Sequence, residues 1–397
     1  MKRILFVSEY VTLAQMVRLV ALADSLDPAR YEVHFAASAF PDFIFGARTW
    51  RRWPLYTLPA EKVFAAVEAG RRLYGRRTLD RYIRADLEII EAIAPDLVVG
   101  DLRWSLTVSA QRAHVPHAAL INAYWSPSAQ RDSFPLPDHP IVRLLGEDLA
   151  AKHFPKALPF VFKHFAAPLD HHRKKHGLPP LRSLLEVLMA GDHVLFADTP
   201  GLAPVKALEP HQHYLGTVLW SPSAPLPAAW QQPKQRPRVY VTLGSSGLLK
   251  LLPATLQAMA ARPIDVLLST AGRVQPNELP ANVTTVDYVD GDRACAAADA
   301  VVTNGGSSTG YQALAQGKPV IGIPSNFDQY LASQAIDATG AGESIAARAL
   351  TPERLSAALD RALGDAGRTR AAAAAAVEIA SYDARARFAA FVARCTA

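Results

Sequence analysis

The chain has 397 residues, of which 50% are hydrophobic and 20% are charged, and its formal net charge is +6. This length exceeds a single hydrophobic core and predicts two domains. No uncharged run reaches the roughly 18 to 20 residues that cross a bilayer, so we expect no integral membrane protein. Cys295 and Cys395 are the only cysteines, too few for a disulfide framework or a four-thiolate zinc site, which favours a reducing cytoplasm.

Short β-branched runs alternate with longer helical patterns in the first half of the chain, which predicts a parallel sheet. The opening run, residues 4–8, meets Glu9 almost at once, and no small-residue cleavage site follows it. It therefore predicts a buried strand and not a secretion signal. Further strands are predicted at residues 32–36, 97–100 and 117–121.

A proline-rich segment, residues 220–237, has neither helix nor strand periodicity and predicts an interdomain linker. A second series of strands follows it, so the second half repeats the architecture of the first. These strands are predicted at residues 238–243, 265–269, 284–286, 300–303 and 320–323. We expect one domain at residues 1–218, a linker at 219–237, a second domain at 238–378, and a last helix at 379–397 that packs back on the first domain.

The most informative segment begins with the predicted strand 300–303. Gly305 and Gly306 follow it and let the backbone approach a ligand closely. Ser307, Ser308 and Thr309 then open a helix whose free N–H groups suit a phosphate. A plain strand-to-helix connection also needs a glycine turn, but a polar pair, Asp328 and Gln329, follows the next strand and favours a ligand site.

A second small-residue turn follows the first strand of the second half. Gly244, Ser245 and Ser246 supply backbone donors there, and in doubly wound sheets ligands bind at the carboxyl ends of the strands. The alternative is a simple connection, because glycine turns after strands are common.

The segment from Asn304 to Gln329 resembles the C-terminal signature of family 1 glycosyltransferases. The resemblance implies the GT-B fold, in which two Rossmann-like, doubly wound α/β domains with parallel sheets face a central cleft. In that family a phosphate-contacting His, a Gly-Gly turn, a ribose-binding Glu and an Asp-Gln pair on the sugar hydroxyls follow one another. The corresponding residues here are Asn304, Gly305, Gly306, Gln312, Asp328 and Gln329.

Two of these positions depart from the family pattern, because Asn304 replaces the His and Gln312 replaces the Glu. Both substitutes still form hydrogen bonds, since an Asn amide can donate to a phosphate and a Gln carbonyl can accept from a ribose hydroxyl. The resemblance also places Tyr288 and Val289 in the loop that binds the nucleotide base. It requires no metal and no cofactor besides the nucleotide-sugar donor, and residues 290–292 are better explained as a turn.

The N-terminal half is similar to the bacterial branch that includes mycobacterial phenolic-glycolipid rhamnosyltransferases. The similarity runs through residues 6–35, 95–103, 122–127 and 214–222, and so covers nearly the whole chain. It implies a UDP- or dTDP-activated sugar as donor, and a phenolic, lipidic or other small hydrophobic acceptor. Tyr124 and Trp125 are the expected acceptor-binding residues.

Members of the family carry a His after the first strand that deprotonates the acceptor, and an Asp that orients it. Gln15 occupies the His position here, whereas the partner is present as Asp101. A carboxamide cannot take a proton, so three alternatives remain: Asp101 or Glu9 is the base, the acceptor needs little assistance, or catalysis is lost. We favour Asp101, with Glu9 second, because burial at a strand end can raise the pKa of a carboxylate. A phenol ionises more readily than an aliphatic hydroxyl and eases the loss of the His.

Ten basic and four acidic residues lie between residues 48 and 86, interleaved with aromatic and aliphatic ones. Such a surface suits peripheral contact with the inner face of a membrane, but a solvated helical face is the simpler explanation of the pattern. Residues 171–176 form a second basic patch that lacks the partners for a zinc site. No nucleic-acid-binding module accompanies either cluster.

We therefore expect an inverting glycosyltransferase that works without a metal. The strongest alternative is a catalytically impaired GT-B protein that acts as a non-enzymatic partner, because the usual base is missing. A sugar-nucleotide epimerase would need an acid and a base flanking the sugar, and the sequence shows no such constellation.

Overall fold

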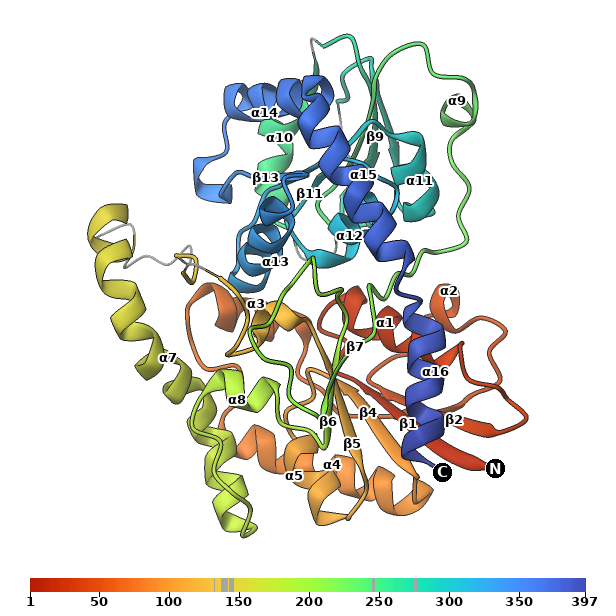
Figure 1. Cartoon of the computed structure of the whole chain (residues 1–397), viewed down its shortest axis with the longest axis vertical. Helices are drawn as coiled ribbons and strands as arrows, with labels where there is room; N and C mark the ends of the chain where they lie inside the picture. Colours follow the sequence, from red (N-terminus) through yellow and green to blue (C-terminus); the bar gives the residue numbers. More distant parts are fainter. Residues whose placement is uncertain (132, 137–141, 143–145, 245–246, 261, 275–277) are drawn as a thin grey trace. The chain divides into compact units, whose positions relative to one another are not determined.

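The computed structural model describes the whole chain except residues 132, 137–141, 143–145, 245–246, 261 and 275–277. It divides into two compact units, each with its own parallel β-sheet and surrounding helices (Figure 1). Unit 1 comprises Met1–Val218 and Tyr382–Ala397, and unit 2 comprises Leu219–Ser381. The expected α/β architecture with two parallel sheets is confirmed.

Unit 1 contains a seven-stranded sheet in the order β3-β2-β1-β4-β5-β6-β7. Its central strands are largely buried, and runs within them such as Ile4–Val7 and Leu97–Val99 are continuously apolar and not alternating. The strands are β1 (Lys2–Ser8), β2 (Tyr31–Ala37), β3 (Arg51–Pro54), β4 (Leu97–Asp101), β5 (His117–Ile121), β6 (His193–Phe196) and β7 (Gln212–Tyr214). The helices are α1 (Leu13–Ala23), α2 (Asp42–Phe45), α3 (Ala60–Glu68), α4 (Arg76–Ile93), α5 (Leu106–Arg112), η1 (Ala123–Trp125), α7 (Glu147–Lys175), α8 (Leu184–Leu188) and α16 (Ala384–Cys395).

The register of this sheet aligns the carboxyl ends of its neighbouring strands, where polar residues follow. Ser8 at the end of β1 pairs with Asp101 at the end of β4, and Ile121 at the end of β5 pairs with Phe196 at the end of β6. Glu9 directly follows β1, so it lies at the same carboxyl edge as Asp101. This is the edge at which doubly wound sheets bind their ligands.

Unit 2 contains a six-stranded sheet in the order β10-β9-β8-β11-β12-β13. Its strands are β8 (Arg238–Thr242), β9 (Asp265–Ser269), β10 (Val283–Val286), β11 (Ala300–Thr303), β12 (Val320–Gly322) and β13 (Gly342–Ser344). Its helices are α9 (Ala228–Gln231), η2 (Leu249–Leu251), α10 (Leu252–Ala260), α11 (Gly291–Ala297), α12 (Ser307–Ala315), α13 (Phe327–Ala338), η3 (Ala347–Ala349), α14 (Pro352–Gly364) and α15 (Ala366–Ala380).

The last helix, α16, belongs to unit 1, although α15 before it belongs to unit 2. Asp383 caps α16 by accepting hydrogen bonds from the N–H groups of Arg385 and Ala386. Phe388 is fully buried and packs against Phe6 of β1, with 5.9 Å between ring centroids. Apolar burial thus fixes the end of the chain to the sheet of unit 1.

The basic segment 48–86 turns most of its apolar side chains inward. Leu55 and Tyr74 are 4% exposed and Tyr82 is fully buried, while Trp50, Trp53, Phe64 and Leu73 are half-buried. Arg48 pairs with Asp24, and Arg51 pairs with Glu32. Leu55, Tyr74 and Tyr82 therefore serve the core of unit 1, and membrane contact through this segment stays a prediction. Among the described residues, no helix is both long and apolar enough to cross a bilayer.

Candidate active site

Two glycine turns lie side by side in unit 2, because Thr242 at the end of β8 pairs with Thr303 at the end of β11. Each threonine accepts a hydrogen bond from the glycine two residues later: the N–H of Gly244 lies 3.1 Å from Oγ1 of Thr242, and that of Gly305 lies 2.9 Å from Oγ1 of Thr303. Both glycines are left-handed, with φ of +59° and +80°. The two turns are therefore built alike, and a side chain would strain either one. Ser245 and Ser246 lie outside the described residues.

Asn304 joins the two turns. Its Oδ1 accepts a hydrogen bond from the N–H of Gly306 at 3.2 Å, and a Cβ added to Gly244 would lie 3.3 Å from its Nδ2. Gly306 is the extended N-cap of α12, and the first turn of that helix holds Ser307, Ser308 and Thr309, of which Ser308 is exposed. The side-chain amide of Asn304 and the N-terminal end of α12, where the helix dipole favours an anion, thus lie at one place.

Arg273, which the sequence motifs do not reveal, adds a cation beside these turns. Its guanidinium donates to the carbonyl oxygens of Gly244 and Gly247 at 3.1 and 2.7 Å. Arg273 lies in the loop after β9, more than twenty residues from either glycine motif, and neighbours them only because β9 pairs with β8. The turn region therefore holds a fixed positive charge besides the dipoles of its backbone.

Gln312 holds the start of the proline-rich segment. Its Nε2 donates to the carbonyl of Trp220 at 3.0 Å and to the hydroxyl of Ser221 at 2.9 Å, and Ser221 in turn donates to Asp292. The amide nitrogen is thus committed to the protein. The remaining Oε1 is the atom of Gln312 that can accept from a ribose hydroxyl.

The Asp328-Gln329 pair lies in the first turn of α13, which Asn326 caps by accepting from the N–H of Gln329 at 3.1 Å. Oε1 of Gln329 accepts from both the N–H and the hydroxyl of Ser325 at 2.9 Å, and the side chain is buried. Asp328, in contrast, is exposed. Of the two side chains, that of Asp328 is therefore the more exposed.

Tyr288 and Val289 form the loop between β10 and α11. Val289 is buried, whereas Tyr288 is 41% exposed and its ring lies against Gly272. Asp290 caps α11 by accepting from the N–H of Arg293, as expected for a turn. Within the part of the chain that the structure describes, no three His, Cys, Asp or Glu residues form a metal-binding group.

In unit 1, Asp101 is held by Arg18 of α1 and is fully buried. Nε and Nη2 of Arg18 donate to the two carboxylate oxygens at 3.0 and 2.9 Å, and Nη1 donates to Oδ1 of Asn122 at 2.6 Å. Asn122 donates in turn to Asp198 at 2.9 Å. A buried polar chain therefore follows the carboxyl ends of β4, β5 and β6.

Gln15 caps its own helix. Its Oε1 accepts hydrogen bonds from the N–H groups of Val11 and Thr12 at 2.9 and 3.1 Å, which satisfies two donors at the start of α1. The side chain is only 8% exposed. The acceptor atom of the residue predicted to replace the base is thus used by the backbone.

Glu9 lies in a second buried cluster, which the sequence does not reveal. Its Oε1 accepts from Arg103 at 3.1 Å and its Oε2 accepts from the hydroxyl of Tyr82 at 3.3 Å, while Arg103 also donates twice to Asp86 at 2.8 and 3.0 Å. Burial raises the pKa of Glu9 and the nearby Arg103 opposes this shift. Glu9 is thus a carboxylate whose proton affinity is increased at a strand end, as a general base requires.

Backbone strain accompanies both carboxylates. Tyr10, next to Glu9, has φ of +51°, and Leu102, next to Asp101, has φ of +56°. Left-handed residues other than glycine cost free energy and concentrate at functional sites. The two adjacent strands β1 and β4 therefore end in strained turns at the same edge of the sheet.

The predicted acceptor residues Tyr124 and Trp125 lie in η1, directly after the polar chain. The guanidinium of Arg131 donates to the carbonyls of Tyr124 and Ser126 and so fixes this short helix. Tyr124 is 5% exposed and Trp125 is half-buried. Trp125 is therefore the more accessible of the two.

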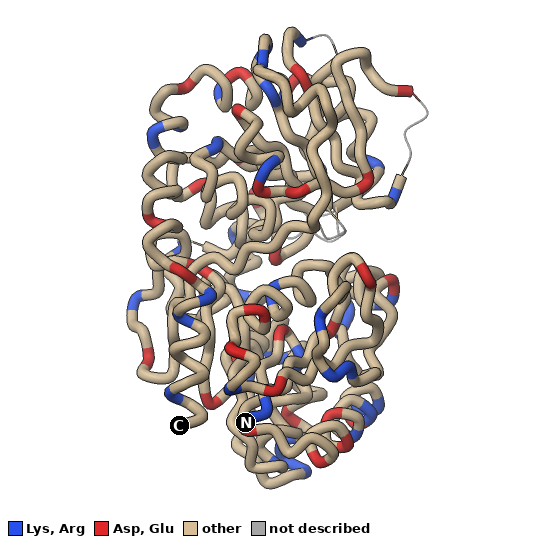
Figure 2. Tube along the Cα trace, turned by 90° about the vertical axis from the view of Figure 1, so that its right-hand side faces the viewer, with Lys and Arg blue, Asp and Glu red and all other residues tan. Residues whose placement is uncertain are grey.

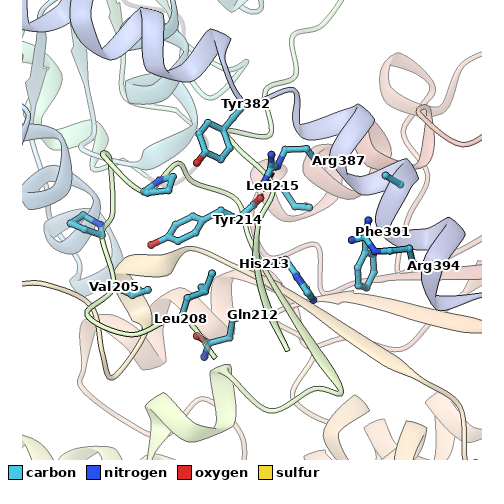
Figure 3. Close-up of a pocket in the computed structure, with 13 residues that line it drawn as sticks. Val205, Leu208, Gln212, His213, Tyr214, Leu215, Tyr382, Arg387, Phe391 and Arg394 are labelled. Atoms are coloured by element: carbon cyan, nitrogen blue, oxygen red, sulfur yellow. Dashed lines mark hydrogen bonds between the residues drawn. The ribbon is translucent and has the colours of Figure 1, made fainter. Parts of the chain in front are cut away.

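A pocket of about 640 Å³ lies elsewhere in unit 1, between strand β7, the loop 200–208 and helix α16 (Figure 3). Tyr214, Tyr382, Phe391 and Arg394 are among its lining residues. None of the residues predicted to bind donor or acceptor lines it.

Comparison with known proteins adds two kinds of relative. Residues 250–391 match the family model of the erythromycin biosynthesis protein CIII-like C-terminal domain. A PGL/p-HBAD biosynthesis glycosyltransferase of Mycobacterium tuberculosis is 45% identical over 367 residues, which cover 92% of this chain and 86% of that protein. A PGL/p-HBAD biosynthesis rhamnosyltransferase of Mycobacterium bovis is 46% identical over 360 residues, which cover 90% and 80%.

Solved structures with the same fold include the spinosyn rhamnosyltransferase SpnG complexed with thymidine diphosphate. It superposes with a TM-score of 0.71 over 99% of both chains, at 19% sequence identity. At this identity the likeness concerns the fold alone.

Proposed function

The chain belongs to the family 1 (GT-B) glycosyltransferases, and we propose that it is an inverting enzyme that moves a sugar from a dTDP- or UDP-activated donor to a phenolic, lipidic or other small hydrophobic hydroxyl compound. Rhamnose on dTDP is the first donor to test, because one relative is named a rhamnosyltransferase and a protein of the same fold is complexed with thymidine diphosphate. The relatives named for glycolipid biosynthesis support a hydrophobic acceptor.

The observation that carries this proposal is the pair of matched glycine turns in unit 2. Gly244 and Gly305, the amide of Asn304 and the guanidinium of Arg273 gather at neighbouring strand ends. Preorganised donors and a cation at one place stabilise the charge that develops on a diphosphate as it leaves the sugar. We therefore also propose that these groups take the part that a metal ion plays in other enzymes, so that transfer needs no added metal.

On the acceptor side, Glu9 and Asp101 remain the two candidates for the base. Each carboxylate accepts hydrogen bonds from a buried guanidinium, and for Glu9 the guanidinium of Arg103 only partly offsets the increase in pKa that burial causes. A phenolic acceptor fits this arrangement, because it needs less help to lose its proton than an aliphatic alcohol does. Gln15 is proposed to shape the start of α1 and to orient neighbouring groups.

Transfer can be tested with purified protein and a panel of dTDP-, UDP- and GDP-sugars. Thermal shift identifies the donor, since a ligand raises the melting temperature by mass action. The best donor is then incubated with an alkyl phenol and with an alcohol of similar size, with and without a chelator. Transfer to the phenol that a chelator does not reduce supports the proposal, and strict dependence on magnesium or manganese overturns metal independence.

The alternative is a GT-B protein without catalytic activity that acts as a partner of another protein. The replacement of the usual His by Gln15 favours it. The two functions differ in one simple assay, because an enzyme slowly hydrolyses its donor even without acceptor. A protein that binds the donor but neither hydrolyses nor transfers the sugar fits the alternative.

A further inference from the structure

Helix α7 presents an exposed face that no part of the proposed reaction uses. Phe160 is 76% exposed and Leu149 is 46% exposed, which is unusual for large apolar residues. Residues at positions 149, 152, 153, 156, 160 and 163 are spaced by three, four and seven, so they share one side of the helix. We call this side the outward face of α7; it consists of Leu149, Lys152, His153, Lys156, Phe160 and Lys163, all exposed.

The opposite side of the helix faces the core of unit 1. Leu158, Phe162, Ala166 and Leu169 are at most 7% exposed, and they lie about half a turn from the outward face. The outward face is therefore distinct from the side of α7 that packs on the core. In Figure 1 α7 lies at the outer margin of unit 1.

At one of the three prolines of α7, a side chain from outside the helix replaces the missing hydrogen bond. Pro168 has no N–H, so it cannot donate to the carbonyl of His164 four residues earlier. Nε of Arg72 donates to that carbonyl at 3.0 Å instead, and Nη2 of Arg72 lies 3.1 Å from Nδ1 of His164. A residue from a distant part of the chain thus supports the helix at the point where it would otherwise weaken.

The charged residues of the outward face itself are basic. Three lysines and a histidine lie on it, whereas the acidic residues of α7, Glu147, Asp148 and Asp170, lie towards the two ends of the helix. Over the side of the molecule seen in Figure 2, basic and acidic residues are interspersed. A face with an excess of basic residues attracts an anionic partner.

We propose that the outward face of α7 docks on an anionic lipid bilayer. Phe160 and Leu149 enter the interface, and Lys152, Lys156 and Lys163 lie against the headgroups. Apolar side chains among lysines can insert into a bilayer. A nucleic-acid backbone, in contrast, would contact the lysines alone and leave Phe160 and Leu149 without a role. This surface goes beyond the proposed transfer reaction and does not depend on it.

Flotation of the full chain with vesicles tests the proposal. We expect it to bind vesicles of phosphatidylcholine mixed with phosphatidylglycerol, and not vesicles of phosphatidylcholine alone. Replacement of the three lysines by Gln should weaken binding by about fivefold per lysine. Phe160→Ser should weaken it further, and salt should reduce it.

Two matched variants serve as controls. Replacement of Arg71, Arg76 and Arg77 by Gln removes the same charge from the segment that the sequence alone singles out. Val377→Ser removes a comparably exposed apolar residue, 74% exposed, from α15. Both should bind the mixed vesicles like the unaltered protein, and all variants should keep the same melting temperature and the same affinity for the donor.

Three results overturn the proposal. The first is the absence of binding to the mixed vesicles. The second is equal binding by the unaltered protein, the lysine variant and Phe160→Ser. The third is binding to a DNA or RNA oligonucleotide that needs the lysines but not Phe160, which assigns the face to a nucleic acid.

Discussion

Arg18 holds Asp101 through both carboxylate oxygens, in a buried ion pair that links helix α1 to the end of strand β4. The same guanidinium reaches Asn122 after β5. One side chain thus connects the ends of two strands to the helix that carries Gln15. The pair fixes the edge of the sheet at which an acceptor is expected.

The first prediction concerns this pair. Arg18→Gln leaves the carboxylate of Asp101 buried without its cation, which should lower the free energy of unfolding by about 3 to 5 kcal/mol. Joint replacement of Arg18 by Met and Asp101 by Leu should restore much of that loss, because no uncompensated charge remains. Urea denaturation of the three proteins gives both values. A loss below about 1 kcal/mol in the single variant contradicts a structural role for the pair.

The second prediction concerns Asp328. If its exposed carboxylate accepts from a sugar hydroxyl, Asp328→Ala should weaken donor binding by about 1.5 to 3 kcal/mol. The nucleoside diphosphate without its sugar should bind nearly as before. Calorimetric titration with both ligands measures the difference, and equal losses for the two would show that Asp328 supports the fold instead.

The third prediction concerns Arg273, for which we expect the donor and the sugar-free nucleoside diphosphate to be affected alike. Its guanidinium lies at the glycine turns, so Arg273→Gln should weaken the donor and the free diphosphate by a similar factor. We expect about tenfold or more, because a charge-assisted hydrogen bond is lost. Undiminished binding of both ligands would place the diphosphate elsewhere.

The predicted donor-binding residues show how much of this site can be predicted from the sequence. The order of Gly244, Gly305 and Asp328 along alternating strands and helices suffices to predict neighbouring strand ends, because parallel α/β sheets bring them together. A sequence motif does not predict which of its side chains form hydrogen bonds with other parts of the protein. Gln312 gives its amide nitrogen to Trp220 and Ser221, and these bonds depend on the path of a segment without periodicity.

On the acceptor side, the sequence does not predict the cluster around Glu9. Arg103, Asp86 and Tyr82 come from a strand end and one helix, and only the packing of α4 against the sheet brings them to Glu9. The sequence analysis also does not predict strands β3, β6, β7 and β13. Of these, β3, β7 and β13 are short edge strands that carry polar residues, so the apolar run that is typical of a central strand is absent.

The fourth prediction concerns pH. Burial raises the pKa of Asp337 to about 6, although Ser344 donates a hydrogen bond that opposes the shift. The folded state then binds the proton more tightly than the unfolded state, so the free energy of unfolding falls as the pH rises from about 4 to about 6. The loss is on the order of 3 kcal/mol.

Asp337→Asn should abolish this part of the pH dependence, because an amide does not titrate. Urea denaturation of both proteins across the same pH range measures it. The residue lies in α13, the helix that carries Asp328, so unfolding of this region should also release the donor. Parallel stability curves for the two proteins would contradict a raised pKa at Asp337.

The last prediction separates the two candidate bases. If Asp101 is the base, Asp101→Asn should lower the rate by roughly a hundredfold or more, with donor binding intact, while Glu9→Gln has a smaller effect. If Glu9 is the base, the order reverses. Because Arg18 and Arg103 hold these carboxylates, each variant must also be compared in its melting temperature, so that a loss of folded protein is not mistaken for a loss of catalysis.

Gln15→His completes the test, since it returns an imidazole to the position at which the family has its base. The change removes the acceptor that caps α1 and should cost about 1 kcal/mol of stability. If the imidazole takes the proton, turnover should rise more for an aliphatic alcohol than for a phenol, because the phenol already ionises more easily. The decisive quantity is therefore the ratio of the rates for the two acceptors, before and after the substitution. An unchanged ratio, together with full activity of Asp101→Asn, would exclude Asp101 as the base and make Glu9 the next residue to test.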